Sequence, residues 1–256
     1  MTFVQLLEQG RINANLSTYK RKKEEAISVC IEQLASHTAP YCAVSGGKDS
    51  VAMACLLNDA ANICKKDFKL WAHVSDASFP GTLETCQALA GKIQRKLDIF
   101  RSDSAFDSVT NKQRAAFGKT GVFFGSVKEY AKDKDVAFVG VRAYESKRRM
   151  QAAKSHGMVF HSTSMGNVDV VNPLQWFRLV DVASLIYEYD APVHPIYHKV
   201  CTDTGKNSNK EPFFIRLGYI TSKDLLDKGT AVFMKLNYPD IYNKLMERFP
   251  EIRNHV

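Results

Sequence analysis

The segment Ser45-Gly46-Gly47-Lys48-Asp49-Ser50 combines residue types that suit the binding of phosphate. Two adjacent glycines let the backbone approach a ligand closely, and a helix that begins directly after them adds unpaired N–H groups and the positive end of its dipole. Lys48 contributes a positive charge, and Ser45 and Ser50 contribute hydroxyl groups. We therefore predict that all six residues bind the phosphates of a nucleotide. The segment is not a Walker A motif, because the pattern G-x-x-x-x-G-K-[ST] is absent.

Arg142 and Arg149 form a second candidate group, shortly after the apolar run 136–140. Guanidinium groups make planar, two-pronged contacts with phosphate or sulfate oxygens, so both arginines are candidates for binding such an anion. Glu145 is expected to orient one of these arginines or to cap the helix that follows. Gly140 ends the apolar run and is expected beside the nucleotide.

Asp76 is the candidate metal ligand. It follows an apolar run, and Mg²⁺ prefers carboxylate and phosphate oxygens, so we expect Asp76 to hold the nucleotide or a Mg²⁺ ion. An ordinary turn at the end of a strand explains this residue almost as well. A zinc site is not expected at His194, His198 and Cys201, because Pro195 interrupts the helical spacing and no fourth ligand is evident.

These candidate residues lie at the junctions of alternating strand and helix patterns. Such alternation predicts an α/β fold with a doubly wound, mainly parallel, Rossmann-like sheet. Ligands bind beyond the carboxyl ends of the strands in such sheets, where the glycine loop, Asp76 and Arg142 fall. The predicted strands are 40–44, 70–74, 99–100 and 136–140, and the predicted helices are 16–36, 50–57, 82–97 and 179–189.

The length of 256 residues allows one large α/β domain with an appendage. We expect residues 1–200 to form a nucleotide-binding domain with N-terminal helices, and residues 201–256 to form a C-terminal extension packed on it. The hydrophobic content of 45% excludes a wholly disordered chain. The net charge of +8 suits anionic ligands without distinguishing phosphates, nucleotides and nucleic acid. The basic run 19–23 is interpreted as the exposed face of a helix.

The cysteines and the N-terminal residues indicate the cellular compartment in which we expect the protein. The six cysteines form no C-x-x-C pair, and several lie in apolar stretches, which favours a thiol-reducing compartment. The N-terminal residues are polar before any long apolar run develops, so neither a signal peptide nor a membrane anchor is expected. We therefore expect a cytoplasmic protein.

The segment 45–50 resembles the SGGKDS signature of the PP-loop ATP pyrophosphatases, which cleave ATP between the α and β phosphates or bind adenylyl sulfonucleotides. Other segments resemble the phosphoadenosine phosphosulfate (PAPS) reductase family within that superfamily. Residues 76–84 are similar to its D-T-G-x-x-F-P-E-T segment, and residues 140–149 are similar to its G-I-R-x-x-E-S-x-x-R segment. Residues 173–176, 181–182 and 192–197 resemble its P-L-x-x-W, D-V-W and P-x-H-P-L-Y elements. The resemblance implies an adenine nucleotide alpha hydrolase-like fold.

The same resemblance implies roles for individual residues. Lys48 and Arg142 would stabilise negative charge that develops on the phosphates, with Mg²⁺ and the N–H groups of the loop. A second set would bind the substrate, and it comprises Arg142, Glu145, Ser146 and Arg149.

The chain lacks the redox groups of reductases in this family. No E-C-G-L-H segment is present to supply the thiolate that attacks sulfur, and Cys201 is the only cysteine after Cys86. Tyr219 stands where many relatives have a cysteine of an R-x-G-C-x-x-C segment. The cysteine pairs that an iron–sulfur cluster needs are missing, so no such cluster is expected.

We therefore expect an enzyme that binds ATP with Mg²⁺ and cleaves it to AMP and pyrophosphate, or transfers the adenylyl group to an acceptor. The acceptor is a small molecule or a nucleic acid of unknown identity. One alternative is a PAPS or adenosine phosphosulfate (APS) reductase that uses Cys201 or a partner's thiol. Another is a nucleotide-sensing or nucleic-acid-modification subunit. A homodimer or an association with a partner subunit is compatible with the sequence.

Overall fold

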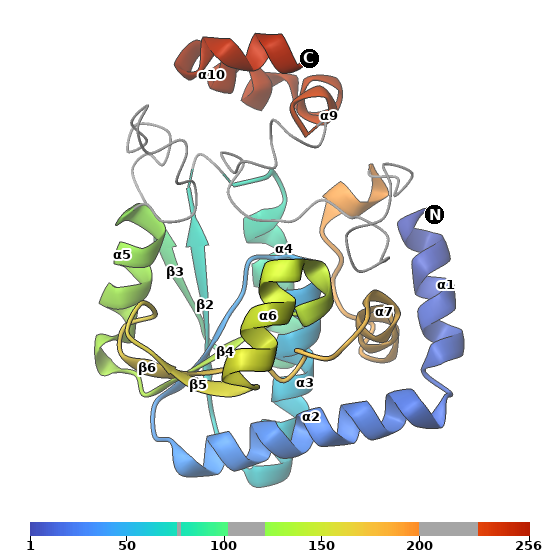
Figure 1. Ribbon diagram of the computed structural model, residues 1–256, viewed down its shortest axis with the longest axis vertical. Coiled ribbons are helices and arrows are strands. Elements are labelled where there is room, and N and C mark those ends of the chain that lie inside the picture. The colour runs from blue at the N-terminus through green and yellow to red at the C-terminus, as the bar shows by residue number, and fades with distance from the viewer. Residues whose placement is uncertain (76–77, 102–120, 200–229) are drawn as a thin grey trace.

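A six-stranded sheet with the strand order β3-β2-β1-β4-β6-β5 organises the protein. The computed structural model describes residues 1–75, 78–101, 121–199 and 230–256 (Figure 1). Neighbouring strands run parallel except for β5, which pairs antiparallel with β6 at one edge. The predicted doubly wound, mainly parallel α/β sheet is confirmed. The strands are β1 (Pro40–Ala43), β2 (Lys69–Val74), β3 (Leu97–Arg101), β4 (Val136–Val139), β5 (Val159–Ser162) and β6 (Val168–Val171).

Helices cover both faces of the sheet (Figure 1). Successive side chains of a strand point to opposite faces, so each strand contributes to two cores. Cys42 and Phe138 lie in the larger core, whereas Tyr41 and Ala137 lie in a second core with Val127. The helices are α1 (Phe3–Asn13), α2 (Ser17–Ser36), α3 (Lys48–Cys64), α4 (Thr82–Ile93), α5 (Gly121–Tyr130), α6 (Lys147–His156), α7 (Leu179–Glu188), α9 (Thr230–Asn237) and α10 (Pro239–Arg248).

Short 3₁₀ segments complete the described elements. They are η2 (Ala131–Asp133), η3 (Ala143–Glu145), η4 (Pro195–His198) and η5 (Pro250–His255). Strands β5 and β6 were not predicted from the sequence. Each has only four residues, and the tight connection between them contains Gly166 and Asn167, both with positive φ. Both strands also contain polar residues, V-F-H-S and V-D-V-V, so they lack the continuous apolar run that marks the equally short β1 and β4.

The basic run 19–23 is not the uniformly exposed face that the sequence predicts. Tyr19 is buried, and its hydroxyl donates a hydrogen bond of 2.5 Å to Glu188 on α7. Lys22 Nζ lies 2.7 Å from Asp181 Oδ2, and Lys23 Nζ lies 3.0 Å from Glu188 Oε2. Half of the predicted basic face therefore neutralises acidic groups of α7, because α2 turns this side toward that helix.

The C-terminal helices α9 and α10 lie on the side toward which the arrow of β2 points in Figure 1. Phe79, which follows β2, packs against Tyr238 between these helices, with 5.9 Å between the ring centroids. The domain boundary predicted at residue 200 lies outside the described residues, as do Asp76, Cys201 and Tyr219. None of the helices in the described ranges is both long and apolar enough to cross a membrane.

Candidate active site

The loop between β1 and α3 has the geometry of an anion-binding turn. Gly46 adopts a φ of +71°, and a Cβ there would lie 3.1 Å from the carbonyl oxygen of Thr82. Glycine satisfies both requirements, because an L side chain is strained at this φ and would crowd Thr82. The Ser50 hydroxyl donates to the carbonyl of Gly47 at 3.0 Å and accepts from the N–H of Ser45 at 3.1 Å. These two bonds fix the loop directly at the N-terminus of α3, which is the favourable position for phosphate.

Three charged side chains form a buried cluster beside this loop. Lys48 is 7% exposed and Arg142 is 3% exposed. The Asp49 carboxylate accepts a hydrogen bond from Lys48 Nζ at one oxygen and from Arg142 Nε at the other, the latter at 2.5 Å. Burial alone would raise the pKa of Asp49, but the charges of Arg142 and Lys48 outweigh burial and hold that pKa below its usual range. The cluster therefore carries two positive charges and one negative charge.

Gly140 brings the end of β4 into contact with the start of α3. A Cβ at this residue would lie 2.6 Å from the carbonyl oxygen of Asp49 and 2.9 Å from the backbone nitrogen of Ser50. The position therefore accepts only glycine without a shift of the backbone. The same approach allows Arg142, two residues later, to reach Asp49, and its Nη1 also donates to the carbonyl of Phe177 at 3.3 Å.

Glu145 takes the first of the two roles considered for it, because it contacts both arginines, whereas Ser146 caps the helix that follows. Its Oε2 accepts a hydrogen bond of 3.2 Å from the backbone N–H of Arg142, so it caps the short segment η3. It also forms an ion pair with Arg149 in the first turn of α6. Ser146 caps α6, because its hydroxyl accepts from the N–H of Arg149 at 3.2 Å. Glu145 therefore couples the backbone of Arg142 to the side chain of Arg149.

Two further residues from η4 and its cap support the loop, and the sequence interpretation did not place them in the site. Tyr197 is buried, and its hydroxyl accepts a hydrogen bond of 3.1 Å from the N–H of Lys48. His194 is completely buried, with Nε2 3.2 Å from the Thr82 hydroxyl and Nδ1 accepting from the N–H of Ile196 at 3.1 Å. Burial lowers the pKa of His194 to about 4, so the ring is neutral near pH 7. The resemblance of residues 192–197 to a family element was the available signal.

The structure thus brings together the six loop residues, Gly140 and Arg142, and it places Glu145, Ser146 and Arg149 next to them. Asp76, the predicted Mg²⁺ ligand, lies outside the described residues. Within the described ranges, no three or more His, Cys, Asp or Glu side chains are arranged to hold a metal ion.

Four of the five described cysteines are poorly suited to nucleophilic chemistry. Burial raises the pKa of Cys30, Cys42, Cys55 and Cys86. A raised pKa lowers the fraction of thiolate, which is the reactive form. Cys201, which the reductase alternative would use, lies outside the described residues.

Comparisons with known proteins agree with this architecture. The sequence profile of the phosphoadenosine phosphosulfate reductase domain matches residues 39–218. No curated protein sequence matches the chain significantly.

Three solved structures are similar in fold. FMN adenylyltransferase from Candida glabrata, in complex with FAD and inorganic pyrophosphate, has a TM-score of 0.58 at 11% identity, over 86% of this chain and 72% of that one. The U34-tRNA thiolase NcsA from Methanococcus maripaludis, with its [4Fe-4S] cluster, has a TM-score of 0.54 at 11% identity, over 93% and 81%. PAPS reductase from Candida auris, in a phosphate complex, has a TM-score of 0.51 at 15% identity, over 71% and 91%.

Proposed function

The chain belongs to the phosphoadenosine phosphosulfate reductase domain family, and on that basis we propose that it binds ATP or a related adenine nucleotide and cleaves it between the α and β phosphates. The adenylyl group passes to an acceptor, or to water. The observation that carries this proposal is the cluster of Lys48, Asp49 and Arg142, which places two cations beside a glycine loop at a helix N-terminus. The similarity in fold to an adenylyltransferase supports the same reaction class.

In the proposed reaction an oxygen of the acceptor attacks the α phosphorus. The bond from that phosphorus to the bridging oxygen breaks, and pyrophosphate leaves with the electron pair. The loop and the N-terminus of α3 bind the β and γ phosphates, and Mg²⁺ enters with the nucleotide as part of the substrate. Lys48 and Arg142 neutralise the charge that develops on the departing pyrophosphate and on the α phosphate. Asp49 holds both cations in position before the nucleotide arrives.

Labelled ATP tests this proposal. Incubation with Mg²⁺ and a set of candidate acceptors, including cell extract, nucleotides and nucleic acids, should yield AMP or an adenylylated product together with pyrophosphate. ADP and orthophosphate as main products would contradict the proposed reaction. Arg142→Ala should slow turnover more than it weakens ATP binding, as expected for a contact that strengthens in the transition state. Arg95→Ala is the matched control, because Arg95 pairs with Asp67 away from the loop.

A nucleotide-sensing subunit is the second candidate. It is favoured by the pairing of both Lys48 and Arg142 with Asp49, because cations that are already engaged with a carboxylate can bind a nucleotide without activating it. Tight binding of ATP without products from any acceptor would support this candidate over the enzyme.

The reductase alternative has a separate test. Burial raises the pKa of Cys30, Cys42, Cys55 and Cys86, and no E-C-G-L-H segment is present, so sulfite should not form from PAPS or APS with thioredoxin and a reductant. Release of sulfite that disappears in Cys201→Ser would instead establish the reductase reaction.

A further inference from the structure

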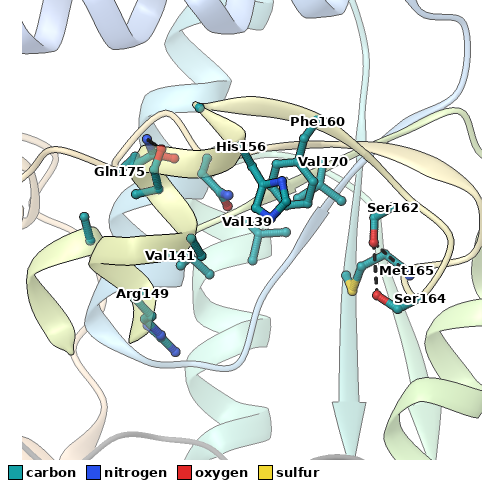
Figure 2. Close-up of a pocket in the computed structure, with 15 residues that line it drawn as sticks. Val139, Val141, Arg149, His156, Phe160, Ser162, Ser164, Met165, Val170 and Gln175 are labelled. Carbon is teal, nitrogen blue, oxygen red and sulfur yellow. Dashed lines mark hydrogen bonds between the residues drawn. The ribbon is translucent and has the colours of Figure 1, made fainter. Parts of the chain in front are cut away.

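The residues at the end of β4 contact α3 on one face of the sheet and line a cavity on the other face. Gly140 faces α3, where its backbone meets that of Asp49. Val139 and Val141, on either side of it, line a cavity of about 250 Å³ beneath α6 (Figure 2). Because side chains alternate in direction along an extended chain, this cavity lies across β4 from the glycine loop. The cavity and the proposed nucleotide site are connected around the end of β4, where Arg149, which lines the cavity, pairs with Glu145 beside Arg142.

The middle of the cavity suits a flat ring. Val139, Val170 and Phe160 form an apolar floor on the sheet, and His156 of α6 lies against Phe160, with 5.3 Å between the ring centroids and an interplanar angle of 35°. Figure 2 shows these four side chains grouped together. Ala152 of α6 also lines the cavity, and its small side chain leaves room beneath the helix. Concave, mainly apolar cavities with a few polar groups are typical of small-molecule sites.

One polar atom in the wall requires a hydrogen-bond donor. Asn172 lines the cavity, is 7% exposed, and its Oδ1 is buried without a hydrogen-bond partner. An unsatisfied buried acceptor is costly, so such atoms are normally paired with protein, water or a ligand. A ligand that fills this cavity should therefore present an N–H or O–H group from its ring to Asn172.

Arg149 contributes a cationic side chain to one end of the cavity. It is linked to Arg142 through Glu145. Figure 2 shows its side chain extending away from the group formed by His156 and Phe160. Helix α6 has ten residues, and none of them is acidic. Four are lysine or arginine, namely Lys147, Arg148, Arg149 and Lys154. An anionic group of the ligand would be most stable at this end.

We propose that this cavity binds the acceptor of the reaction, and that the acceptor is a planar heteroaromatic molecule with an N–H donor for Asn172 and an anionic oxygen at the Arg149 end. The role of this ligand as the acceptor rests on the proposed function. Its chemical class is inferred from the residues that line the cavity. An anionic oxygen needs no general base when it attacks the α phosphorus. This agrees with Asp49 and His194, whose polar atoms are already engaged in hydrogen bonds.

Three indole compounds test the proposed contacts with Asn172 and with Arg149 separately. Indole-3-acetate has a ring N–H and a carboxylate, 1-methylindole-3-acetate lacks the N–H, and tryptophol lacks the charge. Calorimetry or ligand-observed NMR should show about five- to tenfold weaker binding for each of the last two probes than for the first. In Asn172→Leu, indole-3-acetate and its N-methyl form should bind equally, because the acceptor of the N–H is gone.

Two variants of α6 locate the binding. Ala152→Phe should reduce the affinity for indole-3-acetate more than tenfold by filling the cavity. Gln151→Phe places the same ring on the same exposed helix, but Gln151 does not line the cavity, so its affinity should match the wild type. The binding assignment is overturned if indole-3-acetate does not bind, if the three probes bind equally to the wild type, or if the two phenylalanine variants behave alike.

The effect of ATP on the binding of the probes tests whether the ligand of this cavity is the acceptor. Saturating ATP with Mg²⁺ should weaken the binding of indole-3-acetate several-fold and leave tryptophol nearly unchanged, because only the carboxylate lies near the phosphates. Equal effects on both probes would overturn the acceptor role. If the wild type fails to bind ATP while the probe and variant preferences hold, the proposed function fails and the cavity remains a site for this class of ligand.

Discussion

Asp49 and Arg142 are 93 positions apart in the chain, and a hydrogen bond of 2.5 Å joins their side chains. The parallel pairing of β1 with β4 produces this contact, because each residue follows the carboxyl end of one of these neighbouring strands. Asp49 also accepts from Lys48, so one carboxylate pairs with two buried cations. A bound polyphosphate would provide further negative charge to the same cations.

Asp49→Asn should lower the free energy of unfolding by about 3–5 kcal/mol, the range for removing one partner of a buried ion pair. Lys48 and Arg142 would then lose the carboxylate charge that they share. Inorganic pyrophosphate should raise the melting temperature of this variant more than that of the wild type, because the anion replaces the lost carboxylate. Urea unfolding and thermal scans measure the two effects.

Asp67→Asn is the control for that variant, since Asp67 pairs with Arg95 but its side chain is 84% exposed. An exposed pair contributes little, so the control should change the free energy of unfolding by less than about 1 kcal/mol. Equal effects of the two substitutions would show that the cluster does not depend on Asp49.

Lys48→Ala should weaken ATP binding by about 1.5–3 kcal/mol, the range for hydrogen bonds to charged groups, and should affect folding less. Arg142 still pairs with Asp49 in this variant, so the buried carboxylate keeps a partner. Calorimetric titration with ATP and Mg²⁺ measures the change. Lys69→Ala is the control, because Lys69 lies at the amino end of β2 and the loop lies at the carboxyl ends of the strands, so this variant should bind ATP like the wild type. Unchanged affinity in Lys48→Ala would contradict the assignment of the loop.

The sequence predicted the elements whose patterns are long or are bounded by glycine and proline. The helix that precedes β1, strands β1, β2 and β4, and helix α7 all occur close to their predicted ranges. The hairpin of β5 and β6 was missed because both strands mix polar with apolar residues, whereas the equally short β1 and β4 are continuous apolar runs. The place of the hairpin in the sheet depends on contacts with β4 rather than on local pattern.

In the candidate site, too, the sequence predicts the contiguous segments but not the contacts between residues that are far apart in the chain. The loop 45–50 is contiguous, so its residue types and spacing predict an anion-binding turn. The pairing of Asp49 with Arg142, and the support of Lys48 by Tyr197, depend on which strands and segments become neighbours in the fold. The sequence identifies Gly140 as a candidate, but only the structure shows why glycine is required there. At this position the backbones of β4 and α3 are in close contact.

Gly140→Ala should destabilise the protein by about 1–3 kcal/mol, because its Cβ would overlap the backbone of Asp49. The shift of α3 that relieves this overlap should also weaken ATP binding. Gly91→Ala is the matched control, since no atom lies within 4 Å of a Cβ at this position in α4. Alanine is favoured over glycine in a helix, so the control should gain about 0.5–1 kcal/mol. Chemical denaturation distinguishes the two, and a neutral Gly140→Ala would contradict the close approach of β4 and α3.

His194 should make stability depend on pH below neutrality. Its pKa in the folded protein is about 4, compared with 6.5 for an unperturbed histidine, because burial disfavours the charged ring. As the pH falls from 6.5 toward 4, the unfolded chain takes up a proton at this residue and the folded protein does not, so folding loses up to about 3 kcal/mol. His194→Asn should remove this part of the pH dependence, which urea unfolding at a series of pH values measures.

His161 provides a control for that experiment with the opposite sign. It is exposed, and its hydrogen bonds to Asp169 and Asn167 raise its pKa in the folded protein. Its contribution to stability is therefore present at low pH and is lost as the pH rises through that raised pKa. His161→Gln should leave the loss between pH 6.5 and 4 at least as large as in the wild type, whereas His194→Asn should reduce it. If both variants kept the wild-type slope, His194 would not be the neutral, buried support of the Thr82 segment that its contacts indicate, and another group would have to account for the loss of stability in acid.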